Sequence, residues 1–515
     1  MNRIITYTIA LLIFLFIGTS ILSVSDLFPD ELIDSKWYMS VGSGLLMLLF
    51  FSGLGMIKPK QLKWDVIDKS FVYAVLTACF IESVYILLQE IGAVAKIGLF
   101  TIGNFDNAAG AVSALCLGLP LGMCIKKRQN KYLLSVLIPM QIICIVAVIF
   151  SGSRTGLICL CVLGVMYMPK NKTSLQIITL TILVFITFLF CVLLKQDSTK
   201  GRFFIAERTA EMINEKPVFG WGHGGFTENY MNYQATYFSE HTDDACKMLA
   251  DNIRHPLNEF LLICVDYGLL GLTVLIVIIA CFVYYVYTRK LQHRKLLLTE
   301  VIMLFIWSLF SYPFSYPFTW IVVIYILSSS VIHGKWMERQ WVAGVGIIVS
   351  CVLLVTYTRA IYFTMQCRTL QDDIAVGKYG KALRGFEKIY PYKSDEYRFL
   401  YSYAFALAQA GKYAKAQKLI GECERYVADY DVQLLKGDIM AKLGYYDSAE
   451  NAYENAHYMC PSRLTPLYEL CHLYIIAGMR EKALSKRQEL LMMPIKVNSE
   501  KACRIKQEIE ILKIN

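Results

Sequence analysis

Residues 197–271 read DSTKGRFFIAERTAEMINEKPVFGWGHGGFTENYMNYQATYFSEHTDDACKMLADNIRHPLNEFLLICVDYGLLG. They form the only long polar interval that separates two apolar segments of the chain. Three arginines and three histidines fall within it, among carboxylates and glycines: Arg202, Arg208, Arg254, His223, His241 and His255. A polar loop of this length between membrane spans is a natural place for chemistry at a membrane surface.

The composition indicates a membrane protein. The chain has 515 residues and is 56% hydrophobic, which is above the share found in ordinary soluble domains. The net charge of +10 does not indicate nucleic-acid binding, because much of the Lys and Arg lies in short loops between apolar runs. Most of the 16 cysteines lie inside those runs, and no CxxC pair suggests zinc or redox chemistry. The sequence therefore predicts neither a metal nor another cofactor.

The apolar runs predict an all-α polytopic membrane domain over residues 1–358, with about eleven transmembrane helices. The predicted spans lie near residues 4–22, 37–57, 70–90, 104–125, 132–150, 155–168, 174–194, 258–287, 296–310, 316–332 and 341–359. Basic residues gather in alternate loops, whereas the first opposite loop, SDLFPDELIDSK, is acidic. The positive-inside rule then places the N-terminus in the cytoplasm, and the loop at residues 195–257 and the C-terminal region outside it. If the short span at 155–168 were re-entrant, every later segment would change sides.

A short pattern recurs in residues 359–515, where the composition becomes that of a soluble helical domain. The segments GKYGKA, GKYAKA, GYYDSA and GMREKA begin 33 or 34 residues apart, at Gly377, Gly411, Gly444 and Gly478. Each has an alanine at the same place: Ala382, Ala416, Ala449 and Ala483. This pattern resembles tetratricopeptide repeats, with Gly at a turn and Ala where paired helices touch. It predicts an α-solenoid with a concave surface for a protein partner, against the alternative of an unrelated helical bundle.

The fifth span ends in SGSRTG, residues 151–156. A guanidinium on the outer side of the membrane suits bidentate recognition of phosphate, and the adjacent Gly and Ser allow close backbone packing. The alternative for Arg154 is a side chain that only snorkels to the interface.

Several segments together resemble the O-antigen ligase and O-antigen polymerase superfamily. They are GNFDNAAG at residues 103–110, SGSRTG, Gly201-Arg202, KPVFGWGHGGF and HPLNEFLLICVDYGLLGL, in this order along about the first 340 residues. The resemblance implies a bacterial inner-membrane glycosyltransferase of the C-type architecture. Such enzymes transfer a glycan from undecaprenyl pyrophosphate to an acceptor without a nucleotide sugar or an obligatory metal.

The resemblance also implies roles for individual residues. Arg154 and Arg202 match the arginines thought to hold the lipid pyrophosphate, and His255 matches the histidine proposed as general base. Further candidates are Arg254, Asn258, Glu259, His241 and His223. The family often has His directly before Asn, whereas Pro256 and Leu257 intervene here, which keeps His241 and His223 as alternatives. A helix starting at Pro256 would place His255 and Asn258 on one face.

Structural explanations remain open for the same residues. His255 could simply start a helix, and His223 could be an exposed turn residue. Asn258 and Glu259 could cap or orient a helix, and Arg208 with Glu211 fits a surface pair at three-residue spacing. Glu82, inside a span, is expected to be a buried hydrogen-bond partner of a group that the sequence does not identify.

The acceptor of such a transferase is not determined by the sequence. It could be lipid A core in a ligase, another lipid-linked glycan in a polymerase, or a protein hydroxyl in an O-oligosaccharyltransferase. A solute transporter is the rival interpretation, but it predicts paired broken spans in two related halves, which the sequence lacks. A non-catalytic membrane scaffold needs only the repeats and leaves the arginines and histidines unexplained.

Overall fold

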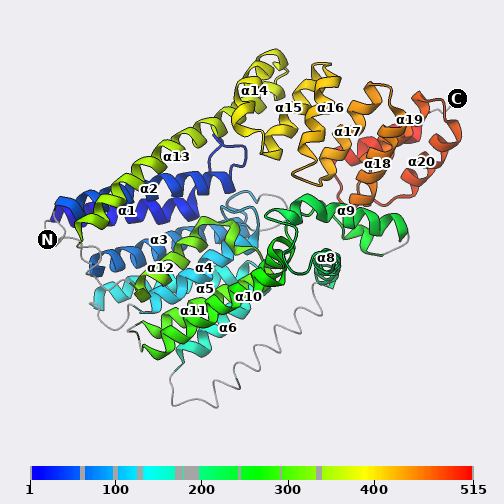
Figure 1. Ribbon diagram of the computed structural model, residues 1–515. Coiled ribbons are helices and arrows are strands. Elements are labelled where there is room, and N and C mark those ends of the chain that lie inside the picture. The colour runs from blue at the N-terminus through cyan, green and yellow to red at the C-terminus, as the bar shows by residue number, and fades with distance from the viewer. Residues whose placement is uncertain are drawn as a thin grey trace. The chain divides into compact units, whose positions relative to one another are not determined.

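The computed structural model describes residues 3–57, 64–96, 102–124, 131–168, 178, 196–241, 245–289, 291, 293–331 and 339–512. The predicted span at 174–194 lies outside them, apart from residue 178. The described chain is helical throughout and contains no strand. It divides into two compact units: residues 1–194 with 276–368, and residues 195–275 with 369–515 (Figure 1). The division of the chain after residue 358 stays a prediction.

Ten helices coincide with ten of the predicted spans. Five are long and apolar enough to cross a membrane: α1 (Arg3–Leu22), α2 (Ile33–Ile57), α3 (Trp64–Glu90), α10 (Glu259–Thr288) and α13 (Gln340–Ala375). The others are shorter: α4 (Ala108–Cys124), α5 (Lys131–Phe150), α6 (Arg154–Tyr167), α11 (Arg294–Phe310) and α12 (Pro317–Val331). α13 continues without a break past residue 359, where the sequence predicted the end of the last span. The membrane character is thus supported, whereas the number of crossings stays a prediction.

Helix α4 forms the centre of the first unit. It packs against α3, α5, α6, α11 and α12, and its residues 110–122 are all buried. Small residues make this possible, since a Cβ atom at Gly118 would lie 2.5 Å from Cys79 Sγ on α3. The GNFDNAAG segment, which leads into α4, is therefore joined to a helix that is buried along most of its length.

The second unit begins with the polar loop that opened the sequence analysis. It contains α8 (Gln196–Glu215), α9 (Gly225–Glu240), the short 3-10 helix η4 (Ala245–Met248) and the first part of α10. The aromatic residues of α8 and α9 form a core, with Phe204 stacked on Phe238 and Phe226 on Tyr230. The loop is thus folded, and its apolar core continues into C-terminal residues such as Tyr430 and Met459.

A kink in α10 joins this loop to the membrane helix. Gly268 has φ 67°, and a Cβ atom there would lie 2.1 Å from the carbonyl oxygen of Val218. The chain before and after the kink pairs with the KPVFGWG segment, since the N–H of Trp221 donates to Val265 O at 2.7 Å and that of Leu269 to Pro217 O at 2.8 Å. The KPVFGWG and VDYGLLG segments are therefore two halves of one structure that needs glycine at the kink.

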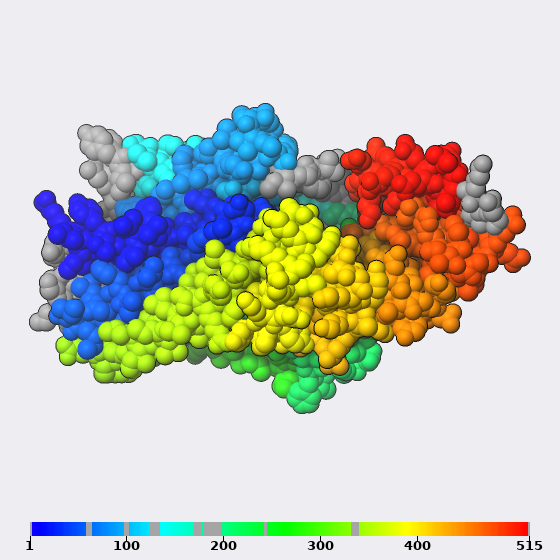
Figure 2. Space-filling view, turned by 90° about the horizontal axis from the view of Figure 1, so that it is seen from above, coloured from blue at the N-terminus to red at the C-terminus, as the bar shows by residue number. Residues whose placement is uncertain are grey.

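The C-terminal helices of the second unit follow one another in chain order, and each packs against the next (Figures 1 and 2). They are α14 (Tyr379–Lys393), α15 (Tyr397–Gln409), α16 (Tyr413–Cys423), α17 (Tyr430–Lys442), α18 (Tyr446–Met459), α19 (Thr465–Ile476), α20 (Arg480–Met492) and α21 (Glu500–Ile511). Neighbour-to-neighbour packing of this kind is typical of helical repeat proteins.

Four turns, one between α13 and α14 and three between later helices, have the same backbone geometry. Each contains a glycine with positive φ, and the residue after it donates its N–H to the carbonyl five residues earlier; the glycines are Gly377, Gly411, Gly444 and Gly478. This Schellman pattern satisfies the last carbonyls of the preceding helix. The alanine five residues after each glycine is 0% exposed, namely Ala382, Ala416, Ala449 and Ala483. A larger side chain there would force neighbouring helices apart.

Candidate functional site

The GNFDNAAG segment is held by a buried carboxylate. Glu82 on α3 is 0% exposed and accepts hydrogen bonds from the backbone N–H and the side-chain amide of Asn104, both at 2.8 Å. Gln89, two turns further along α3, bonds both backbone groups of Gly103. A Cβ atom at Gly103 would lie 2.0 Å from Glu82 Oε1, so only glycine fits beside this carboxylate. The expectation that Glu82 is a buried hydrogen-bond partner is confirmed, and its partner is Asn104.

A buried lysine contacts the same segment, and no pattern in the sequence indicates it. Lys36 on α2 donates to the carbonyl oxygens of Ser23 and Asn104 and lies 4.7 Å from the centre of the Phe105 ring. A lysine this deeply buried needs such partners, because an isolated ammonium is costly away from water. The segment is thus fixed by polar side chains from two helices.

Arg154 is the first residue of α6. Ser153 caps that helix, since its hydroxyl accepts the backbone N–H of Gly156 at 3.2 Å. A Cβ atom at Gly156 would lie 2.5 Å from Val112 of α4, which confirms the close packing expected from the small residues of SGSRTG. The half-buried guanidinium therefore starts from the positively polarised end of a helix that is firmly fixed to the core.

Arg202 and Arg208 lie on α8 in the second unit. Arg202 is exposed, on the second turn of the helix. Arg208 instead lies over the Tyr237 ring at 4.1 Å and forms an ion pair with Glu211 at 3.2 Å, which confirms the expected pair at three-residue spacing. Of these two arginines, Arg208 is a packing residue of the loop, and Arg202 is the one presented on the surface.

The start of α10 sets the surroundings of His255. The helix begins at Glu259, one residue from the predicted start of this span at 258, so the start at Pro256 that would have placed His255 and Asn258 on one face does not occur. The side chain of Asn258 caps the helix by accepting the N–H groups of Phe260 and Leu261. The capping role considered for Asn258 is thereby confirmed. Leu257, inserted between the His and the Asn, has a left-handed backbone with φ 57°. This turn replaces the shared helical face that a start at Pro256 would have given.

The inserted Leu257 also determines how the imidazole is held. Its backbone N–H donates to His255 Nδ1 at 2.9 Å, so the neutral ring carries its proton on Nε2. Nε2 faces the carboxylate of Glu259 at 3.6 Å, and both side chains are largely buried. The two residues therefore form a pair in which the Glu259 carboxylate faces and orients the imidazole.

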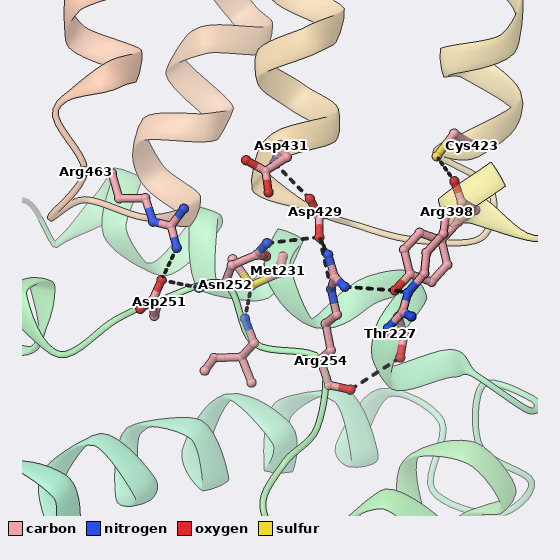
Figure 3. A network of polar contacts seen from close by, with 12 residues as sticks. Thr227, Met231, Asp251, Asn252, Arg254, Arg398, Cys423, Asp429, Asp431 and Arg463 are labelled. Atoms are coloured by element: carbon pink, nitrogen blue, oxygen red, sulfur yellow. Dashed lines mark hydrogen bonds and ion pairs between the residues drawn. The ribbon is translucent and has the colours of Figure 1, made fainter. Parts of the chain in front are cut away.

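Arg254, directly before His255, is bound to the C-terminal helices (Figure 3). Its guanidinium donates to Asp429 Oδ2 through Nη2 at 2.7 Å and Nε at 3.2 Å, and to the Tyr397 hydroxyl at 2.9 Å. Asp429 is 2% exposed and also accepts the side-chain amide of Asn252 at 3.0 Å. The structure therefore gives Arg254 an anchoring partner inside its own unit.

A second ion pair anchors the same loop segment. Arg463 donates to Asp251 Oδ1 at 2.6 Å (Figure 3). Burial alone would raise the pKa of Asp251, but hydrogen bonds from the Asn252 N–H and from Arg463 hold this pKa below its ordinary value. The side chain of Gln234 on α9 adds a bond to the carbonyl of Met459 at 2.5 Å. Residues 251–254, which lead into His255, are thus anchored by ion pairs at Asp251 and at Arg254.

The other two histidines lie at ends of α9. His223 is exposed, and its Nδ1 is 3.0 Å from the Tyr267 hydroxyl. His241 follows the last residue of α9 and stacks on Tyr237 with ring centres 4.3 Å apart. Both are exposed, whereas the side chain of His255 is largely buried against Glu259. The N-terminus of α9 is capped instead by Asp266 of α10, which accepts the N–H groups of Gly224 and Phe226.

The sequence-predicted residues fall into both units. Arg154 belongs to the first, whereas Arg202, Arg254, His255, Asn258 and Glu259 belong to the second. The second unit brings His255 and Glu259 together and binds Arg254 to Asp429. In the described part of the chain, no group of three or more His, Cys, Asp or Glu side chains is arranged to hold a metal ion.

Comparison with known families connects these features. A family model described as O-antigen ligase matches residues 139–276, a range that contains SGSRTG, Arg202, His255 and the two segments at the kink of α10. A search of curated proteins found no match. The family match supports glycosyl transfer of the ligase or polymerase type, and the apolar helices support a membrane protein.

Proposed function

We propose that the protein transfers a glycan from undecaprenyl pyrophosphate to an acceptor glycan or to lipid A core, at the periplasmic face of a bacterial inner membrane. The observation that carries this proposal is the O-antigen ligase match over residues 139–276, because that range holds both candidate arginine sites and the His255–Glu259 pair. The donor and acceptor come from the family resemblance and are part of the proposal.

The proposed role of Arg154 and Arg202 is to hold the pyrophosphate. Arg154 is the first residue of α6, whose positively polarised N-terminus attracts anions. A pyrophosphate would accept two parallel hydrogen bonds from the guanidinium. As the glycosyl bond breaks, negative charge grows on the departing phosphate oxygen, and fixed positive groups stabilise it.

The proton-transfer step is assigned to His255 and Glu259 together. The acceptor oxygen forms a bond to the anomeric carbon while the bond from that carbon to the phosphate oxygen breaks, with inversion. Undecaprenyl pyrophosphate leaves with the bonding electrons, and the hydroxyl proton passes to the pair. We favour the pair over the imidazole alone as the group that takes up the proton, because the Leu257 N–H occupies His255 Nδ1 and the Glu259 carboxylate faces Nε2.

The C-terminal helices are proposed to form an α-solenoid of tetratricopeptide-like repeats outside the cytoplasm. The four matching glycine turns and the buried alanines support the repeat, and the predicted charge distribution of the loops supports its location. A protein partner on this region stays a prediction. A reporter that works only in the periplasm, fused after Arg359, is expected to be active; an active cytoplasmic reporter there instead would contradict the topology.

Loss of the protein in its native cell tests the function. The surface glycans are then separated on gels, and the lipid-linked glycans are extracted. Bare core with accumulated long lipid-linked glycan indicates a ligase, and core capped by single units indicates a polymerase. Loss of glycan from secreted proteins alone would identify a protein O-oligosaccharyltransferase. Unchanged glycans on lipid, core and protein would contradict the proposal and leave the transporter interpretation.

A further inference from the structure

An open polar cavity of about 510 Å³ lies at the surface of the second unit, lined by α9, α17, α18 and the loop before α17. Its volume falls in the range of pockets that enclose small organic ligands. None of the residues assigned to the pyrophosphate or to proton transfer contributes to its lining. The cavity is therefore separate from the candidate site already described.

Uncharged hydrogen-bonding groups line one side of this cavity. Ser448, Asn451 and Asn455 follow one face of α18 at helical spacing, and Asn232 of α9 lies opposite in the lining. Within the described residues, these four side chains form no hydrogen bond to the protein. Each amide offers two donors and an acceptor, so the lining provides both kinds of group for a ligand.

The charged side chains that line the cavity are paired with each other, so its net charge is close to zero. Its one cation, Lys436, bonds both oxygens of Glu424 at 2.8 and 3.0 Å, and Gln433 donates to the same carboxylate at 2.8 Å. Apolar side chains such as Val427 and Met440 supply the rest of the lining. Because these charges are paired, the cavity does not favour an anion. A sugar fits the lining better, since its hydroxyls both donate and accept hydrogen bonds and its C–H surfaces are apolar.

The cavity wall is connected to the segment that carries His255. The backbone N–H of Ala428, a lining residue, donates to Thr227 O at 3.1 Å. The hydroxyl of Thr227 is in turn 3.5 Å from the carbonyl oxygen of Arg254, the residue before His255. A chain bound in the cavity would thus lie against the same folded unit that holds the proposed catalytic pair.

We propose that this cavity binds neutral saccharide units of the glycan chain, away from the bond that is made or broken. The inference rests on the proposed glycan transfer and adds a subsite to it. The bound chain comes either from the lipid-linked donor or from the acceptor, since both present the same hydroxyl chemistry. Bound units would increase affinity for longer chains over single repeat units.

The direct test is binding of a sugar that cannot react. Neutral oligosaccharides released from the cell's own surface polysaccharide, without pyrophosphate, are titrated into the full-length protein in detergent. The variant Asn451→Ala/Asn455→Ala removes two amides from the lining, and Asn498→Ala alters an exposed asparagine outside it as the matched control. We expect the double variant to bind about fivefold or more weakly, because each lost hydrogen bond reduces affinity, and the control to bind normally.

Several outcomes would overturn the inference. Equal binding by the double variant and the wild type would contradict it, and so would displacement of the sugar by a short neutral peptide such as tetraalanine. A melting temperature equal to that of the wild type excludes misfolding, and Asn232→Ala provides an independent lining variant that must weaken binding too.

Transfer kinetics separate this inference from the proposed function and identify the source of the chain. The double variant is expected to raise the KM for donors with several repeat units, or for the acceptor, while kcat stays near normal. If the wild type transfers glycan but oligosaccharide binding does not depend on the amides, only the subsite is wrong. If the wild type transfers nothing to any acceptor, the proposed function fails whatever the oligosaccharide titration shows.

Discussion

A substitution at Arg154 distinguishes a phosphate-binding role of its side chain from simple anchoring at the membrane interface. Arg154→Lys keeps the charge but loses the planar fork, so we expect transfer to fall by about tenfold or more. Arg359→Lys on α13 is the matched control, since Arg359 is an exposed arginine on an apolar helix. Initial rates with a lipid pyrophosphate donor provide the measurement. Normal transfer by a correctly inserted Arg154→Lys protein would favour snorkelling to the interface.

The His255–Glu259 pair makes a prediction about two residues at once. If both share the acceptor proton, Glu259→Gln and His255→Ala should each lower kcat by about a hundredfold or more, with donor binding largely retained. His241→Ala and His223→Ala, which alter exposed histidines, should have milder effects.

The relative severity of these variants decides the assignment. A dead His255→Ala protein with an active Glu259→Gln protein would restore the imidazole as sole base. If His241→Ala is inactive and His255→Ala is normal, the Pro-Leu insertion has moved the base elsewhere. If none of the three histidines matters, general-base catalysis by histidine is wrong for this chain.

At the residue scale, local spacing in the sequence predicted the contacts that lie within one helical turn. The Asn258 cap and the Arg208–Glu211 pair belong to this class. Arg254 and Asp429 are 175 residues apart, and nothing in either local pattern indicates the other. Ion pairs of this kind depend on tertiary packing, so one sequence alone could not identify Asp429.

At the element scale, the kinked helix α10 determines how the polar loop joins the membrane domain. Gly268→Ala would place a Cβ atom 2.1 Å from the Val218 carbonyl in a left-handed backbone, so we expect a strongly destabilised or poorly inserted protein. Gly421→Ala in α16 has no heavy atom within 4 Å of the new Cβ and should be neutral or slightly stabilising. Thermal unfolding in detergent compares them, and equal melting temperatures would contradict the account of the kink.

Sequence patterns predicted where most helices occur but not how they end. Apolar length sufficed for the membrane helices, because a span needs about twenty apolar residues whatever its neighbours are. The start of α10 at Glu259 lies one residue from the predicted start at 258, whereas the left-handed backbone of Leu257 before it could not be predicted from the pattern. The extension of α13 to Ala375 was also missed, because the hydropathy of the sequence drops near residue 359 whereas the helix continues.

At the scale of the whole molecule, the loop and the C-terminal helices form one compact unit. Asp429→Asn tests whether that association positions His255. The amide can still cap α17, so we expect a folded protein that loses the charge on the Arg254 partner and shows a lower kcat with little change in donor binding. Asp447→Asn, at an exposed position in α18, is the control.

Measurements of kcat and of the pH–rate profile well below the melting temperature separate positioning from stability. A purely structural role for Asp429 would lower the melting temperature and leave both unchanged, which would contradict positioning. The sequence predicted the loop and the helical repeats as separate features. Their association could not be predicted, because it rests on contacts such as Arg463–Asp251 between distant parts of the chain.

The central claim is tested most directly with purified full-length protein, an undecaprenyl pyrophosphate-linked glycan and separate acceptors: lipid A core and a second lipid-linked glycan. The measurement is the release of undecaprenyl pyrophosphate together with glycan joined to the acceptor. The account predicts that the two appear in equal amounts, without a nucleotide sugar, and that Arg154→Lys slows both. Lack of coupled release with every acceptor, by a folded protein in a native-like membrane, would contradict it.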